Sequence, residues 1–182
     1  TQLNRDEQLA YWINLYNALT VQVVLQYPKA KSILKMKSSF FSIGPWDDEL
    51  LTIEGKAVTL NDIEHRILRP IWQDHRLHFA LNCASIGCPN LSKTVYSSSN
   101  VQAQLQRAQK RYLGHPRGVS LRKNKLVLSS IFDWYLEDFS EDEKGLKAYL
   151  AAQLPQQAQR ILASKNAVDY GYDWDLNEQE SQ

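Results

Sequence analysis

The stretch NRDEQLAYWINLYNALTVQVVLQY, residues 4–27, decides the fold. Asn4 can cap a helix at its start, and Pro28 stops the helix at its end. Within it, apolar side chains occupy nearly all sides, which is typical of a central buried helix. Asn14 and Asn17 interrupt the apolar run, and side-chain amides in such a place need hydrogen-bond partners. We therefore predict a long buried helix in which the amides of Asn14 and Asn17 are buried and need partners.

Working outward from this helix, hairpins and further helices follow without strict alternation, which indicates an α+β fold rather than a doubly wound parallel sheet. We expect one mainly antiparallel sheet, with two hairpins packed on the central buried N-terminal helix and with further helices around it. The expected elements are a hairpin around Glu54-Gly55, a helix at 62–69 that ends before Pro70, a buried strand at 76–83, a helix at 102–113, a second hairpin around Lys123-Asn124, helices at 130–139, 141–154 and 156–165, and an edge strand within 167–177.

Composition narrows the classes of function. The chain has 182 residues and no linker or repeat, so we predict a single domain over 1–182. Lys plus Arg (21) nearly balances Asp plus Glu (20), which gives no support to nucleic-acid binding. The sequence contains no run of about 20 apolar residues, so we predict no membrane span. The glycine-rich phosphate loops of dinucleotide and nucleotide sites are absent, and we expect no cofactor.

The densest cluster of reactive residues is DIEHRILRPIWQDHRLHFALNCASIGCPN, residues 62–90, which contains three of the four histidines and both cysteines. At 100° per residue, Glu64 falls inside the apolar stripe of the predicted helix, and His65 lies beyond its edge. An inward carboxylate is costly without a partner. We therefore expect Glu64 either to form a structural ion pair, with Arg69 or Arg76, or to take part in proton transfer.

Side chains alternate between the two faces of a strand, so the predicted strand at 76–83 places Cys83 on one face and His78 and Asn82 on the other. This makes His65, from the preceding helix, the better general base for Cys83, and His78 a half-exposed strand residue. Cys83 ends the strand where a loop begins, a plausible setting for a nucleophile flanked by free backbone N–H groups.

Three alternatives for the cysteines stay open. They can be inert buried thiols, a Cys83–Cys88 disulfide that closes a small loop, or two ligands of a metal site completed by His75 or His78. The spacing is C-x4-C, which differs from the C-x2-C of common zinc knuckles.

Several runs together resemble the family called domain of unknown function 547, and they are YWINLYNAL (11–19), LTIEGKAVTLNDIEHRILRP (51–70), HFALNCASIGCPNL (78–91), IFDWYLEDF (131–139) and YDWDLN (172–177). The resemblance implies a single α+β domain, found in bacteria and often exported, hence periplasmic or secreted. It draws attention to Glu64-His65 and Asn82-Cys83 as the polar centre. A cysteine, a histidine and an acid also resemble, more loosely, papain-like and transglutaminase-like thiol enzymes, here in a rearranged order because the histidine comes first.

The working hypothesis is a cysteine-dependent hydrolase or acyltransferase that acts on a small-molecule or peptide ligand. Cys83 is the nucleophile, His65 the general base, Glu64 the orienting acid, and Asn82 or nearby backbone N–H groups stabilise the oxyanion. One rival is a non-catalytic exported binding module with a Cys83–Cys88 disulfide. The other is a metal protein that uses the cysteines with His75 or His78.

Overall fold

The computed structural model describes residues 2–39, 42–122, 125–164 and 168–177. The chain divides into two compact units, one made of Thr1–Leu105 with Asp173–Gln182 and the other of Gln106–Tyr172. Each unit contains helices and a small sheet, so the predicted α+β class is confirmed, with two small sheets in place of one. That the two units form a single domain over 1–182 stays a prediction.

Helix α1 (Arg5–Gln26) is the central helix of the first unit, as predicted. The Asn4 side chain accepts a hydrogen bond from the Glu7 N–H at 2.9 Å, and the Glu7 carboxylate accepts one from the Asn4 N–H at 2.8 Å. This reciprocal pair satisfies two N–H groups that the helix itself leaves open. The core around α1 buries Leu9, Ile13, Tyr16, Leu60, Ile63, Leu68 and Leu77, among others.

The first hairpin also forms where it was predicted. Strands β1 (Leu51–Ile53) and β2 (Lys56–Val58) are antiparallel, and Ile53 pairs with Lys56 across the turn. The two turn residues, Glu54 and Gly55, have φ of 48° and 76°, as a two-residue turn between twisted strands requires. Leu51 and Ile53 pack against the core that contains α1.

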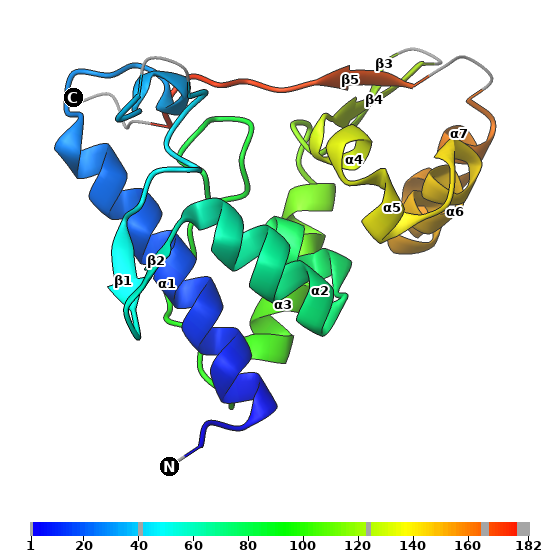
Figure 1. The fold of residues 1–182 in the computed structure, drawn as a ribbon. Helices are drawn as coiled ribbons and strands as arrows, with labels where there is room; N and C mark the ends of the chain where they lie inside the picture. Colours follow the sequence, from blue (N-terminus) through cyan, green and yellow to red (C-terminus); the bar gives the residue numbers. More distant parts are fainter. Residues whose placement is uncertain (1, 40–41, 123–124, 165–167, 178–182) are drawn as a thin grey trace. The chain divides into compact units, whose positions relative to one another are not determined.

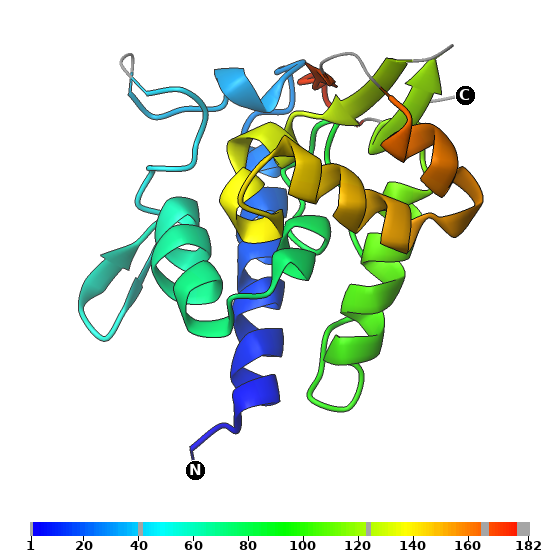
Figure 2. The same cartoon turned by 90° about the vertical axis from the view of Figure 1, so that its right-hand side faces the viewer.

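A helix forms where one was predicted at 62–69, but it is a π-helix, and the helical segment continues beyond the predicted end. Residues Asp62–Leu68 form a π-helix, η2, which lies beside α1 (Figures 1 and 2). The Arg69 N–H donates to the carbonyl of Glu64, five residues back. A short α-helix, α2 (Arg69–Trp72), then continues through Pro70, so the prediction that the helix ends before Pro70 is wrong. Proline is tolerated there because the first turn of a helix needs no N–H from it.

The prediction of a strand at 76–83 is also wrong. Residues His75–Phe79 form a 3₁₀-helix, η3, capped by Asp74, whose side chain accepts from the Arg76 N–H at 2.9 Å. Short apolar runs fit a buried strand and a buried helical turn equally well by periodicity, and the capping aspartate favours the turn. Because no strand forms, consecutive side chains from Leu77 to Asn82 are all buried rather than alternating.

The remaining elements of the first unit are η1 (Ile33–Lys35), the start of α3 (Val101–Leu113) and the segment 173–177. This last segment makes isolated antiparallel bridges at Ser32–Asp175 and Ser85–Leu176. It therefore joins two parts of the chain that are far apart in sequence.

In the second unit, β3 (Val119–Arg122) and β4 (Lys125–Ser129) form the second hairpin, whose predicted turn residues, 123 and 124, lie outside the described residues. Strand β5 (Asp169–Gly171) adds to β4 in parallel. Helices α6 and α7 pack on each other (Figure 2, orange). The helices of this unit are the rest of α3, α4 (Ile131–Trp134), α5 (Leu136–Phe139), α6 (Glu143–Gln153), η4 (Pro155–Gln157) and α7 (Ala158–Leu162). No helix in the described ranges is long and apolar enough to cross a membrane.

Candidate functional site

A buried acid and a buried histidine face each other in the first unit. The π-helix η2 turns Glu64 inward, as predicted, and leaves it 7% exposed. The 3₁₀-helix η3 holds His78 inward at 4% exposed. The distance from Glu64 Oε1 to His78 Nδ1 is 3.8 Å, within ion-pair range and longer than a hydrogen bond. The partner of the inward carboxylate is thus a histidine.

The two arginines considered as partners of Glu64, Arg69 and Arg76, make contacts with other residues. Arg76 binds Asp74 through its Nη2, 2.6 Å from Oδ2, and Arg69 contacts His65, with Nη1 3.1 Å from Nδ1. Arg76 also donates to the Gln102 side-chain oxygen at 2.7 Å. In the described part of the chain, Glu64 forms its ion pair with His78, in place of the expected arginine.

His65 lies on the exposed side of η2, away from the side that buries Glu64. Since arginine can only donate, Nδ1 of His65 is the acceptor in the contact with Arg69. The reason for preferring His65 over His78 was the alternation of a strand that does not form. Geometry brings His78, and not His65, to the acid.

Asp74 and Arg76 hold η3, and with it His78, in position. Asp74 caps the turn and also accepts from the Arg76 Nε at 2.9 Å, so one carboxylate binds both the backbone and the side chain of the same residue. Burial alone would raise the pKa of Asp74. The hydrogen bonds and the positive charge of Arg76 outweigh that effect and hold the pKa below its ordinary value.

Two asparagines fix the backbone that leads into Cys83. The Asn17 amide, 6% exposed on α1, donates to the carbonyl of Ala80 at 3.0 Å and accepts from the Asn82 N–H at 2.8 Å. These are the partners that a side-chain amide within the apolar run of the helix was predicted to need. Asn82, 5% exposed, donates to the carbonyl of Pro89 at 2.7 Å and accepts from the Ala84 N–H at 2.9 Å. Its amide thus spans the base of the loop 83–89.

The two cysteines are not joined by a disulfide, and their surroundings differ. Cys88 is 3% exposed; its sulfur accepts from the Cys83 N–H at 2.8 Å and donates to the carbonyl of Leu81 at 3.7 Å. Cys83 is partly exposed, with its sulfur 3.2 Å from the Ser85 hydroxyl, and it packs against an apolar cluster that contains Leu176. Cys88 therefore acts as a structural thiol, while Cys83 is the accessible one.

Five backbone N–H groups of the loop 83–89 donate hydrogen bonds to other groups of the first unit. The N–H groups of Cys83 and Ala84 donate to side chains of the same loop region, and the Cys88 N–H donates to the carbonyl of Ser85. Those of Ile86 and Gly87 donate to carbonyls of the segment 173–177 at 2.8 and 2.9 Å. The expectation of free N–H groups around Cys83 is therefore wrong for these five.

Sequence reasoning missed two parts of this site. One is His78, whose burial follows from the Asp74 cap; an aspartate two residues before an arginine in a polar turn is the signal that could have found it. The other is the segment 173–177, which local sequence patterns could not have placed on this loop. Among the described residues, no group of three or more His, Cys, Asp or Glu side chains could hold a metal ion, so the three-ligand metal site is not assembled there.

Comparison with protein families finds a match between residues 1–113 and the model of the family described as protein of unknown function, DUF547. The chain belongs to this family. The matched part of this DUF547 protein contains Glu64, His65, His78, Asn82 and both cysteines. The similar runs at 131–139 and 172–177 lie beyond it. No curated protein and no solved structure matches the chain.

Proposed function

We propose that this DUF547 protein is a cysteine-dependent hydrolase or acyltransferase in which Cys83 is the nucleophile and Glu64 and His78 form the acid–base pair. The observation that carries the proposal is the buried Glu64–His78 pair, in which His78 lies five residues before the partly exposed thiol of Cys83 in the sequence. A buried carboxylate is expensive to maintain, and a histidine beside it is the partner that proton transfer requires.

A carboxylate at Nδ1 favours the tautomer of His78 that carries its proton there, and Nε2 is then the basic nitrogen. In unliganded sites such contacts are often longer than a hydrogen bond and shorten when substrate binds. Glu64 is therefore the orienting acid, as expected from the sequence, and His78 takes the role that the sequence analysis gave to His65.

The chemistry has two steps. The Cys83 sulfur attacks the carbonyl carbon of an ester or amide, the proton of the thiol passes to His78, and the leaving oxygen or nitrogen receives that proton as its bond to carbon breaks. Water, or an acceptor alcohol or amine, then attacks the thioester and gives up its proton to His78. The bond to sulfur breaks, and Cys83 recovers its proton.

Asn82 is better suited to positioning than to binding the oxyanion. Its amide nitrogen already donates to Pro89 and its oxygen accepts from Ala84, and these two bonds set the path of the loop that presents Cys83. We therefore assign Asn82 as a positioning residue for the nucleophile.

The test is turnover of p-nitrophenyl esters and peptide p-nitroanilides by the wild type, Cys83→Ala and the matched variant Cys88→Ala. We expect Cys83→Ala to abolish turnover, a loss of at least about a hundredfold, and Cys88→Ala to retain most of it if the variant stays folded. Equal turnover in the wild type and Cys83→Ala would contradict the proposal.

The second candidate is the exported binding module with a Cys83–Cys88 disulfide, and the approach of the Cys88 sulfur to the Cys83 backbone favours it. This candidate predicts no turnover by any of the three proteins. It also predicts a melting temperature that falls on reduction of the wild type and does not respond to reductant in either variant. Export to the periplasm or outside the cell stays a prediction.

A further inference from the structure

We propose that the second unit binds a short uncharged peptide segment in the pocket between α3 and the end of α6, at a site that does not depend on the thiol chemistry proposed above. The pocket has a volume of about 500 Å³, within the range of small-ligand sites. It is lined by Gln106, Gln109, Lys110, Leu113, Gly114, Gln153, Leu154, Pro155, Gln156 and Gln157.

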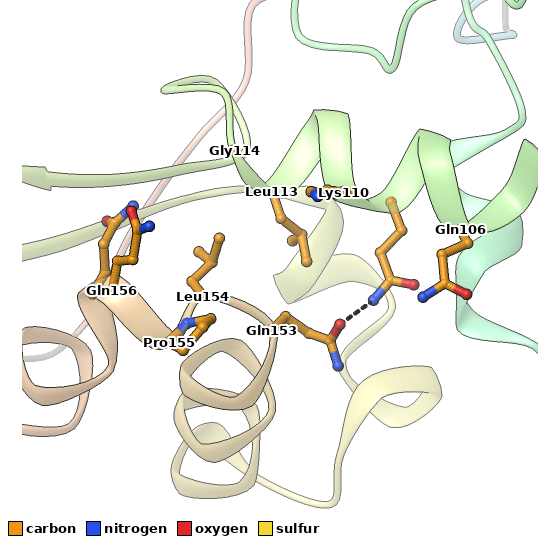
Figure 3. A pocket seen from close by; sticks show the side chains of 10 residues that line it. Gln106, Lys110, Leu113, Gly114, Gln153, Leu154, Pro155 and Gln156 are labelled. Carbon is orange, nitrogen blue, oxygen red and sulfur yellow. Dashed lines mark hydrogen bonds between the residues drawn. The ribbon is translucent and has the colours of Figure 1, made fainter.

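The pocket combines an apolar floor with amides at both ends. Figure 3 shows Leu113 and Leu154 facing each other between the two helices, with Gln106 toward one end and Gln156 toward the other. Helix periodicity accounts for the α3 side, because residues three, four and seven apart share one face. An aliphatic side chain fits between the leucines, and polar groups beside it can reach the amides.

Gln109 organises one end of the pocket. This side chain is 7% exposed, and its amide nitrogen donates to the Tyr149 hydroxyl at 3.1 Å and to the Gln153 side-chain oxygen at 2.9 Å. With its oxygen engaged in this way, Gln153 presents its own amide N–H groups as donors at an exposed position. Part of the lining is thus held in place before any ligand binds.

The charge of the lining points to a neutral ligand. Among the ten residues that the structure describes around the pocket, Lys110 alone carries a formal charge, and it is exposed. Glutamine side chains both donate and accept hydrogen bonds, as do the peptide groups of a backbone. No aromatic ring belongs to this lining to stack against a sugar. The matching chemistry is therefore a peptide with an aliphatic side chain.

The experiment records ¹H–¹⁵N spectra of the full ¹⁵N-labelled chain during titration with N-acetyl-Ala-Leu-Ala-amide. We expect saturable shifts confined to residues 106–114 and 153–157, including the side-chain amides of Gln109 and Gln153. An analogue in which one backbone amide is replaced by an ester should bind about three- to tenfold more weakly, as expected for one lost hydrogen bond.

Matched variants locate the site. Gln156→Leu removes one exposed amide of the lining and should weaken binding about three- to tenfold, while Gln159→Leu, an exposed glutamine of α7 outside the lining, should leave binding unchanged. Cys83→Ala should bind the tripeptide as tightly as the wild type, so this test fails or succeeds independently of the thiol assignment. Absence of saturable shifts, equal losses in the two glutamine variants, or tighter binding of maltotriose than of the tripeptide would overturn the proposal.

Discussion

The loop 83–89 in the first unit and the glutamine-lined pocket in the second both contain many polar groups, but they use them differently. In the loop, the Asn82 side chain and five backbone N–H groups form hydrogen bonds with other groups of the first unit. Asn17 on α1 holds the segment that leads into the loop. In the pocket, Gln106, Gln153 and Gln156 are exposed. Polar groups that form hydrogen bonds within the protein hold the backbone of the loop in place, whereas exposed side-chain amides remain available to a ligand.

The largest contrast between the two regions should be the effect of Asn17→Ala and of Gln156→Ala on the free energy of unfolding. The first substitution leaves the Ala80 carbonyl and the Asn82 N–H buried without their partner, and we expect it to lower the free energy of unfolding by about 2–4 kcal/mol. The second removes an exposed amide and should change it by no more than about 0.5 kcal/mol. Urea unfolding of both variants measures this, and equal losses would remove the contrast between the regions.

A smaller effect, with a defined pH dependence, should come from Asp74→Asn, which keeps a capping side chain and removes the charge that binds Arg76. The pKa of Asp74 is lowered in the folded protein, so its charge stabilises the fold above the unfolded value of about 3.9, and this stabilisation is lost as the pH falls through the lower folded value. We expect a loss of about 1 kcal/mol near neutrality, because the ion pair with Arg76 is partly exposed and solvent screens it.

This loss should shrink as the pH approaches about 3, where the unfolded carboxyl is already protonated. Urea unfolding of the wild type and Asp74→Asn across this pH range measures the change. A difference between the two proteins that stays constant with pH would show that the cap, and not the charge, matters.

The sequence predicted the elements that local patterns determine. Capping and burial predicted α1, the Glu54-Gly55 turn predicted the first hairpin, and the apolar stripe predicted that Glu64 points inward. The segment 76–83 was assigned to the wrong class because periodicity cannot separate a short buried strand from a buried 3₁₀ turn. The predicted alternation of that strand was the reason for preferring His65 to His78 as the general base. The contact between 173–177 and the loop depends on residues about ninety positions apart, which single-sequence patterns do not reach.

Alkylation of the native protein by iodoacetamide over a pH series shows whether the Glu64–His78 pair activates Cys83, with mass spectrometry to locate the label. We expect selective labelling of Cys83 near neutral pH. Its rate should fall at least about tenfold in His78→Gln and in Glu64→Gln and change less than about twofold in His65→Gln, with melting curves to confirm that each variant is folded. A rate unchanged in folded His78→Gln, or a fall confined to His65→Gln, would contradict this activation.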